Sequence, residues 1–287
     1  MATWSDGYWW SNDGLRLHYR DYPGPAGKPL ILCIPGLTRN ARDFDGVAGR
    51  LAGSWRIICV ELRGRGESAY AKDPMTYVPL TYLQDMEALI RELALDRFIL
   101  FGTSLGGLIT MLLAASEGPR IAGALVNDIG PELDERGLAR IRSYVGRSQS
   151  WPTWIHAARH FAESQREVYP GWRLEQWLTF AKRLCRLGPG GRISFDYDMR
   201  IGEPFRIPGG ATGFDLWKAF GGLRGIPSLA VRGEHSDLLS AATLERMTAT
   251  VPELEAVTVP NVGHAPTLDE PEAIAAADRL LARVVAG

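Results

Sequence analysis

The chain has 287 residues, of which 46% are hydrophobic and 23% are charged, and its formal net charge is −1. A chain of this length buries a large core, so we expect one domain with room for an appended lobe. The near-neutral charge gives no support for nucleic-acid binding, and no run of about eighteen apolar residues is present to cross a membrane.

The N-terminus and the cysteines favour a cytoplasmic protein. The opening residues MATWSDGYWW lack the basic stretch and apolar core of a signal peptide. Three cysteines, Cys33, Cys59 and Cys185, do not make a disulfide framework. The first two fall in predicted strands, where a reduced thiol acts as a small hydrophobe.

The first 130 residues alternate between predicted strands and helices. Residues 8–22 are typical of a hairpin of two antiparallel strands. Four continuous apolar runs predict buried strands: 29–36, 55–62, 97–102 and 121–128. Helical spacing of apolar residues separates them, at 40–53, 80–95 and 105–118. Continuous apolar strands alternating with helices predict a parallel sheet covered on both faces.

The pattern changes in the second half of the chain. Residues 131–213 contain no apolar strand run but several tryptophans and helical patches. Strand and helix signals then return, with strands predicted at 227–234 and 255–261 and a closing helix after them. We therefore expect an α/β core formed by 1–130 and 214–287, interrupted by a mostly helical insertion.

Ser104 lies in the segment Gly102-Thr103-Ser104-Leu105-Gly106, which fits G-x-S-x-G. The motif falls where a predicted strand meets a predicted helix, and such a turn lifts a serine hydroxyl out of the backbone at the carboxyl edge of a sheet. The glycines suit a turn in which chain segments approach too closely for Cβ atoms. Ser104 is the predicted nucleophile.

His264 is the predicted general base for Ser104. It follows the last predicted strand in VPNVGHAP, and such a loop reaches the same sheet edge as the serine. The other histidines carry weaker signals: His18, His156, His160 and His235. His156 and His160 have a spacing that can bind zinc, but no third ligand is evident, so no metal site is predicted.

Two aspartates compete as the acid that orients the base. Asp237, in VRGEHSDLLS, follows a strand and precedes His264 by about thirty residues, and it is the preferred choice. Asp128, in VNDIGPEL, also ends a strand and is the alternative. For the oxyanion hole, the amide of Leu105 follows the nucleophile, and the amide of Leu37 lies in the loop after the first central strand.

The ordered set of PG, ELRGRGES, GTSLGG, GEHSD and VGHAPTLDEP resembles the α/β-hydrolase fold superfamily, in its branch with a helical cap. The resemblance implies a mostly parallel eight-stranded sheet with helices on both faces and a cap at 131–213. It also implies the roles given above for Ser104, His264 and Asp237. Two positions depart from the family pattern: Pro35-Gly36 replaces His-Gly, and Glu61 replaces an aspartate.

A serine nucleophile narrows the predicted chemistry to acyl transfer, because relatives that cleave carbon–halogen bonds or epoxides carry aspartate there. We expect a serine hydrolase acting on a small or medium carboxylic ester or lactone, with no cofactor. A carbon–carbon or enol-lactone hydrolase of ring degradation is the alternative within enzymes, and a non-catalytic ligand-binding receptor is the alternative outside them. The expected partner is a small molecule rather than nucleic acid or a membrane, and homo-oligomer formation is left open.

Substrate contacts are less well defined by the sequence. Large aromatic side chains of the insertion, such as Trp154 and Trp177, either line an apolar pocket or anchor the cap. Arg39, Arg63 and Arg65 fall on loops at the predicted catalytic edge, where an arginine either braces a loop or holds a substrate carboxylate. Arg39, Trp154 and Trp177 are the candidates for substrate binding.

Overall fold

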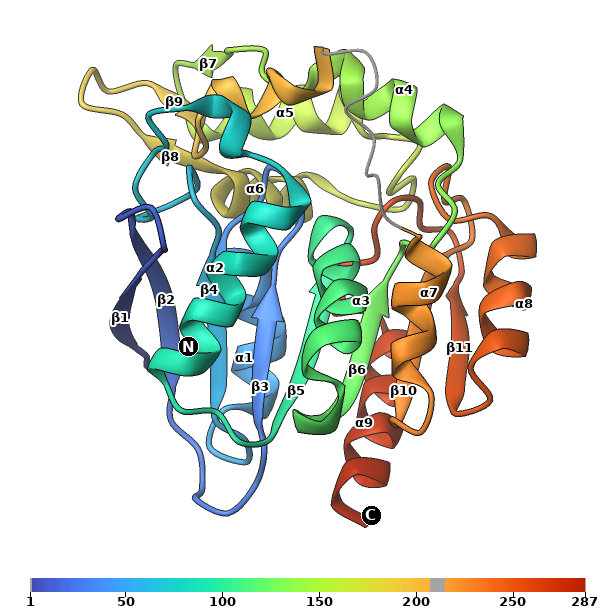
Figure 1. The fold of residues 1–287 in the computed structure, drawn as a ribbon. Helices are drawn as coiled ribbons and strands as arrows, with labels where there is room; N and C mark the ends of the chain where they lie inside the picture. The colour runs from blue at the N-terminus through green and yellow to red at the C-terminus, as the bar shows by residue number, and fades with distance from the viewer. Residues whose placement is uncertain (1, 207–214, 287) are drawn as a thin grey trace.

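A twisted eight-stranded sheet forms the centre of the computed structural model, which describes residues 2–206 and 215–286 (Figure 1). In spatial order its strands are β1 (Ser5–Trp10), β2 (Arg16–Tyr22), β4 (Ile57–Glu61), β3 (Leu30–Ile34), β5 (Phe98–Thr103), β6 (Ile121–Asn127), β10 (Ser228–Gly233) and β11 (Leu254–Val259). The predicted hairpin is confirmed, because β1 pairs with β2 in antiparallel register and β2 pairs with β4 in the same sense. The remaining pairs are parallel.

The central strands are apolar throughout because both faces of the sheet are covered. Every residue of β3, β4 and β6 is buried. Helices α2 (Pro79–Glu92), α3 (Leu105–Glu117), α7 (Leu216–Phe220) and α8 (Ala241–Thr250) contribute to one hydrophobic core, and α1 (Asp45–Leu51) and α9 (Pro271–Ala286) contribute to the other. The predicted fold class, a mostly parallel sheet with helices on both faces, is confirmed.

Short 3₁₀ helices join several of these elements. They are η1 (Ala41–Phe44), η2 (Pro74–Thr76), η3 (Gly118–Arg120), η4 (Met199–Gly202), η5 (Pro204–Arg206) and η6 (Gly221–Leu223). The first of them occupies the start of the segment predicted as one helix at 40–53, so α1 is shorter than expected.

The insertion lies above the carboxyl ends of the parallel strands (Figure 1). It contains α4 (Glu135–Tyr144), α5 (Trp154–Ser164) and α6 (Leu174–Leu184), as the helical patches predict. It also contains an antiparallel sheet in the order β7 (Ser150–Trp151), β9 (Ile193–Phe195), β8 (Cys185–Leu187), which was not expected. The predicted boundary between 213 and 214 lies outside the described residues.

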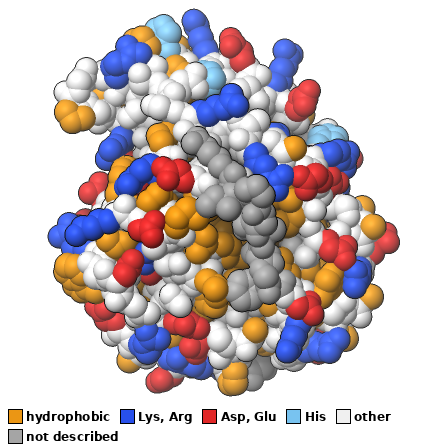
Figure 2. All heavy atoms as spheres, turned by 45° about the horizontal axis from the view of Figure 1, so that its top comes forward, with side chains coloured by type: hydrophobic (Ala, Val, Ile, Leu, Met, Phe, Trp, Pro, Cys, Tyr) orange, Lys and Arg blue, Asp and Glu red, His pale blue; other side chains and the backbone are white. Residues whose placement is uncertain are grey.

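Charges of both signs are interspersed over the face that carries the insertion, and Figure 2 shows no single dominant patch of either sign. This distribution agrees with the net charge of −1. The three cysteines are buried and free. Among the described helices, none combines the length and apolar character that crossing a bilayer requires.

Candidate active site

Ser104 occupies the sharp turn between β5 and α3, with φ of 53° and ψ of −115°. This left-handed conformation is rare for a residue with a side chain, and it turns the serine out of both elements. The flanking glycines are required by close packing. A Cβ on Gly106 would lie 1.9 Å from the carbonyl oxygen of Ile34, and one on Gly102 would lie 2.3 Å from that of Gly106.

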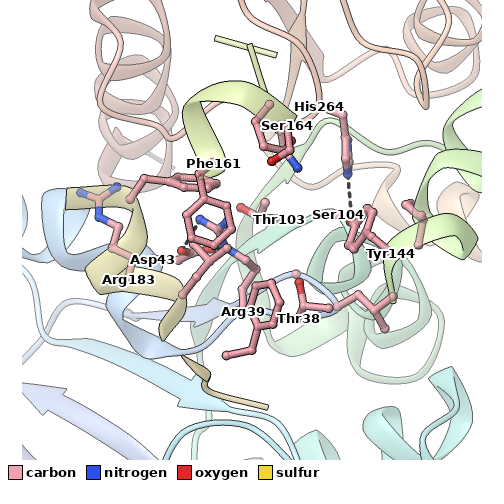
Figure 3. A pocket seen from close by; sticks show the side chains of 18 of the residues that line it. Thr38, Arg39, Asp43, Thr103, Ser104, Tyr144, Phe161, Ser164, Arg183 and His264 are labelled. Carbon is pink, nitrogen blue, oxygen red and sulfur yellow. Dashed lines mark hydrogen bonds and ion pairs between the residues drawn. The ribbon is translucent and has the colours of Figure 1, made fainter. Parts of the chain in front are cut away.

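His264 lies in the loop after β11 and reaches Ser104 across the sheet edge. Its Nε2 is 2.9 Å from the Ser104 Oγ (Figure 3). Its Nδ1 is 2.8 Å from Oδ2 of Asp128. In the tautomer with hydrogen on Nδ1, the ring donates to Asp128 and accepts from the serine hydroxyl, which is the arrangement required for a general base.

Asp128 follows β6 and is completely buried. Its Oδ1 accepts from the backbone N–H of Gly233 at 2.8 Å, and its Oδ2 accepts from the Ser236 hydroxyl at 2.7 Å as well as from His264. These donors fix the carboxylate and satisfy it in the absence of solvent. The structure thus assembles a continuous Ser104–His264–Asp128 chain of hydrogen bonds.

The preference for Asp237 as the partner of His264 is wrong, and the alternative, Asp128, takes that position. Asp237 instead accepts two hydrogen bonds from Arg140 of α4, at 2.5 and 2.8 Å. Burial opposes ionisation of Asp237, but the bonds from Arg140 outweigh it and hold the pKa of its carboxyl below the usual value. Both aspartates follow strands at one sheet edge, so their order in the sequence did not distinguish them.

The loop after β3 lies against the nucleophile. A Cβ built on Gly36 would be 3.6 Å from that of Ser104, so the loop at Gly36 lies within van der Waals contact of the serine. Leu37 lines the adjoining cavity, and Leu105 is the first residue of α3, where N–H groups lack helical partners. Both proposed oxyanion donors therefore come from segments next to Ser104.

Arg65 supports that loop from behind. Its side chain is fully buried and donates to the Leu37 carbonyl through Nε at 2.9 Å and Nη2 at 2.6 Å. Its Nη1 donates to the Arg63 carbonyl at 2.6 Å and to the Tyr82 hydroxyl at 2.9 Å. Arg65 therefore braces the loop.

Arg63 is also a structural residue. It is buried and forms ion pairs with Asp13 and Asp85, at 2.8 and 2.7 Å. Because its buried guanidinium is paired with both carboxylates and it is not among the described residues that line the cavity at Ser104, it is not available to a substrate there. Glu61, the second departure from the family pattern, is buried and accepts a hydrogen bond from the backbone N–H of Glu67 at 2.6 Å. The Glu61 carboxylate therefore stabilises the loop at Glu67, and among the described residues it makes no hydrogen bond to Ser104 or His264.

A cavity of about 390 Å³ opens above Ser104, between the core and the cap. The core contributes Thr38, Arg39 and His264, and the cap contributes aromatic side chains such as Phe161. Figure 3 shows these groups around the serine. This volume suits a small or medium organic molecule.

Arg39 does line the cavity, as expected of a substrate-binding candidate, but it is already paired. Its Nε and Nη2 each donate to Asp43 at 2.6 Å, and its guanidinium lies over the Phe180 ring, 4.6 Å from the centroid. The pair carries no net charge into the cavity. Arg39 therefore offers polar groups but little attraction for an anion.

The two tryptophan candidates lie elsewhere. Neither Trp154 nor Trp177 is among the described residues that line this cavity. Trp154 packs against the hydrophobic cluster that joins buried cap residues to the face of the sheet covered by α1 and α9. Trp177 is buried in an aromatic cluster with Tyr169, Trp172 and Phe180. These contacts agree with the anchoring alternative and do not support direct contact with a substrate in this cavity.

Other aromatic residues of the cap take the place predicted for the tryptophans. They are Tyr144, Phe161, Tyr169, Phe180, Phe195 and Tyr197. His160 also lines the cavity, whereas His156 bonds to Thr153 at the start of α5. Helical spacing alone did not identify these residues, because it does not tell which side of a cap helix faces the core.

The fold and the hydrogen-bonded chain define a hydrolase with an α/β core and a cap. A model of the alpha/beta hydrolase family matches residues 31–277, and the chain belongs to that family. Among curated relatives, a 3-hydroxybutyrate-oligomer hydrolase of Cupriavidus necator is 35% identical over 271 residues, covering 91% of each chain. A 2-(acetamidomethylene)succinate hydrolase of Mesorhizobium japonicum is 28% identical and covers 82% of this chain and 81% of its own length.

A solved structure extends the similarity to the whole chain. The crystal structure of an alpha/beta hydrolase from Novosphingobium aromaticivorans is 58% identical, covers 99% of both chains and superposes with a TM-score of 0.95. The resemblance expected from the sequence motifs is therefore confirmed, and the protein is a hydrolase.

Proposed function

We propose that the protein is a serine hydrolase that cleaves a carboxylic ester or lactone through an acyl-enzyme. The observation that carries the proposal is the Ser104–His264–Asp128 chain, with separations of 2.9 and 2.8 Å, at the floor of a cavity. A serine hydroxyl needs a base held in the correct tautomer, and Asp128 holds the His264 ring for that purpose.

Each half of the reaction uses the same groups. His264 Nε2 takes the hydroxyl proton as Ser104 Oγ attacks the substrate carbonyl, and the amides of Leu37 and Leu105 receive the developing oxyanion. Collapse of the tetrahedral intermediate breaks the carbon–oxygen bond, and His264 returns the proton to the departing alcohol. Water then attacks the acyl-enzyme with His264 again as base, releasing the acid and Ser104.

One relative supports an ester of a short hydroxy acid as the substrate. The Cupriavidus necator relative is named for 3-hydroxybutyrate oligomers, which are linked by ester bonds. The cavity combines aromatic walls with polar groups such as Arg39 and Ser164, which suits a chain that alternates methyl-bearing carbons with ester oxygens. We propose short 3-hydroxybutyrate oligomers as the first substrates to test.

Intact-mass analysis after treatment with a fluorophosphonate tests the proposed nucleophile. The wild-type chain should gain one adduct and lose turnover of a short aryl ester, whereas Ser104→Ala should gain none. Ser164→Ala is the matched control, because Ser164 also lines the cavity but, among the described residues, makes no hydrogen bond to His264. Undiminished turnover in Ser104→Ala would contradict the proposed mechanism.

A substrate panel distinguishes ester cleavage from the alternatives. Hydroxybutyrate dimers and trimers should be cleaved with a higher kcat/KM than a ring-fission dienoate. The reverse order would favour a carbon–carbon or enol-lactone hydrolase. Binding of these compounds without turnover, unchanged by Ser104→Ala, would favour a ligand-binding receptor.

A further inference from the structure

Four arginines line the cavity that contains Ser104: Arg39, Arg140, Arg147 and Arg183. Three of them are neutralised by carboxylates. Arg39 pairs with Asp43 at 2.6 Å, Arg140 with Asp237 at 2.5 Å, and Arg183 with Asp269 at 2.9 Å. An anion that approached any of these guanidiniums would meet the charge of its partner.

Arg147 differs from the other three. Within the described ranges 2–206 and 215–286, no carboxylate lies within 4.0 Å of its guanidinium. The segment 207–214, IPGGATGF, contains no Asp or Glu that could supply one. Arg147 therefore brings a positive charge to the cavity that no neighbouring side chain cancels.

The backbone holds Arg147 at a defined place on the cap. It follows α4, and its N–H donates to the Tyr144 carbonyl at 3.2 Å. The preceding Gly146 has a φ of 76°, and a Cβ there would lie 2.7 Å from the Met199 carbonyl oxygen. This close contact fastens the turn against η4, and the side chain of Arg147 extends from a fixed point of the backbone. Because that side chain is exposed, its position is at the solvent side of the cavity.

We propose that Arg147 binds the free carboxylate of an anionic ester substrate while the ester carbonyl lies at Ser104. The inference rests on the proposed function and further specifies that the substrate carries a negative charge. A guanidinium can donate two parallel hydrogen bonds to a carboxylate, which gives orientation as well as attraction. The neutral, polar interior then accommodates the uncharged ester portion, and the uncancelled charge of Arg147 receives the acidic end of a short hydroxy-acid oligomer.

The test compares two substrates that differ only in charge: a 3-hydroxybutyrate dimer with a free carboxylate, and the same dimer with a terminal carboxamide. The wild-type enzyme should prefer the acid in kcat/KM by roughly tenfold, mainly through KM, because a solvent-facing charged pair contributes modestly. Arg147→Met should lower this preference to near one, and Arg147→Lys should retain part of it. Turnover of the carboxamide should stay near wild type in both variants.

Arg142→Met is the matched control. Arg142 is an exposed arginine of α4, the helix that Arg147 follows, but it pairs with Glu135 and is not among the described residues that line the cavity. It should keep the wild-type preference. Equal use of the two substrates by the wild type, or an unchanged preference in Arg147→Met, would overturn the carboxylate site. Neither result would affect the proposed function. The proposed function fails instead if Ser104→Ala still cleaves the ester bond of the carboxamide-terminated dimer.

Discussion

Asp128 is held by three donors, and its contact with His264 Nδ1 fixes both the tautomer and the direction of the ring. An asparagine at this position keeps the size of the side chain but can turn its amide N–H₂ toward the ring and favour the wrong tautomer. We expect Asp128→Asn to lower kcat by about 10³–10⁴-fold.

Asp237→Asn provides the comparison. Because Asp237 bonds to Arg140 rather than to His264, its substitution should lower kcat by less than about tenfold. Steady-state kinetics on one aryl ester checks both variants. A larger loss of kcat in Asp237→Asn than in Asp128→Asn would assign the acid to Asp237 instead.

Arg65 acts on the proposed oxyanion donor through the Leu37 carbonyl. Without these two bonds the loop has more freedom, and the Leu37 amide is less well aimed at the oxyanion. We expect Arg65→Lys to lower kcat by about 10-fold to 100-fold with little change in KM, since loss of a donor outright costs about 10²–10³. A boronic acid that mimics the tetrahedral intermediate should bind more weakly by a similar factor.

The control for Arg65 is Tyr82→Phe. It removes the hydroxyl that accepts from Arg65 Nη1 but leaves the bonds to Leu37 in place. If this variant loses as much kcat as Arg65→Lys, or if boronate affinity is unchanged in Arg65→Lys, the arginine serves stability alone.

Some of the site residues could be predicted from the sequence and others could not. Ser104 and His264 were predicted because each carries a local signature, glycines around a turn in one case and a loop after the last strand in the other. Asp128 has no such signature. Its role depends on β6 lying between β5 and β10, an arrangement fixed by long-range pairing. Arg147, proposed above to bind a carboxylate, carries no sequence signal, because the proposal depends on which neighbouring charges the fold leaves away from it.

At the scale of elements, the long strands of the core were predictable and the strands of the cap were not. Continuous apolar runs mark β3 and β6 because both faces of these strands are buried. By contrast β7 has two residues, and β8 and β9 have three each, which is too short for any periodicity to develop. The misassigned tryptophans have a related cause: Trp177 packs on partners within the cap itself, which no pattern in one helix reveals.

The ion pair between Asp237 and Arg140 joins the loop after β10 to helix α4. The contact is reinforced by the backbone, since Gly137 N–H donates to the Asp237 carbonyl at 2.9 Å and Asp134 N–H donates to the Leu238 carbonyl at 3.0 Å. A Cβ on Gly137 would lie 2.7 Å from that Asp237 oxygen, so the two segments are in close contact. This is one place where the cap is fastened to the core.

The stability that this ion pair contributes should decrease as the pH falls. The pKa of Asp237 is lowered in the folded state, so its stabilising effect is complete above the unfolded value of 3.8 and declines as the pH falls through the lower folded value. We expect wild type to exceed Asp237→Asn in free energy of unfolding at neutral pH, and the difference to shrink below about pH 4. Urea unfolding at a series of pH values measures it; a difference that grows on acidification would contradict the assignment.

At the scale of the whole molecule, the N-terminal hairpin is joined to the parallel body of the sheet through a buried histidine. His18 of β2 contacts Oε2 of Glu61, at the end of β4, through Nδ1 at 2.9 Å, and Oδ1 of Asp6, in β1, through Nε2 at 3.0 Å. Burial disfavours the charged imidazole, but the two carboxylates outweigh it, and the pKa of His18 is raised above 6.5. The antiparallel edge of the sheet is thereby tied to the body by an imidazole that contacts a carboxylate on each side.

The raised pKa of His18 predicts a pH dependence opposite to that of Asp237. The stabilising effect of a charged His18 is complete below its unfolded value of 6.5 and is lost as the pH rises through the higher folded value. We expect His18→Gln to be less stable than wild type by the largest margin at about pH 5 to 6, with the margin narrowing toward about pH 9. Urea unfolding of both proteins measures this margin, and Asp237→Asn serves as the control because its difference from wild type should stay constant over that range. A margin for His18→Gln that widens with pH would mean that the histidine is neutral in the folded protein and that the hairpin is held by its backbone pairing alone.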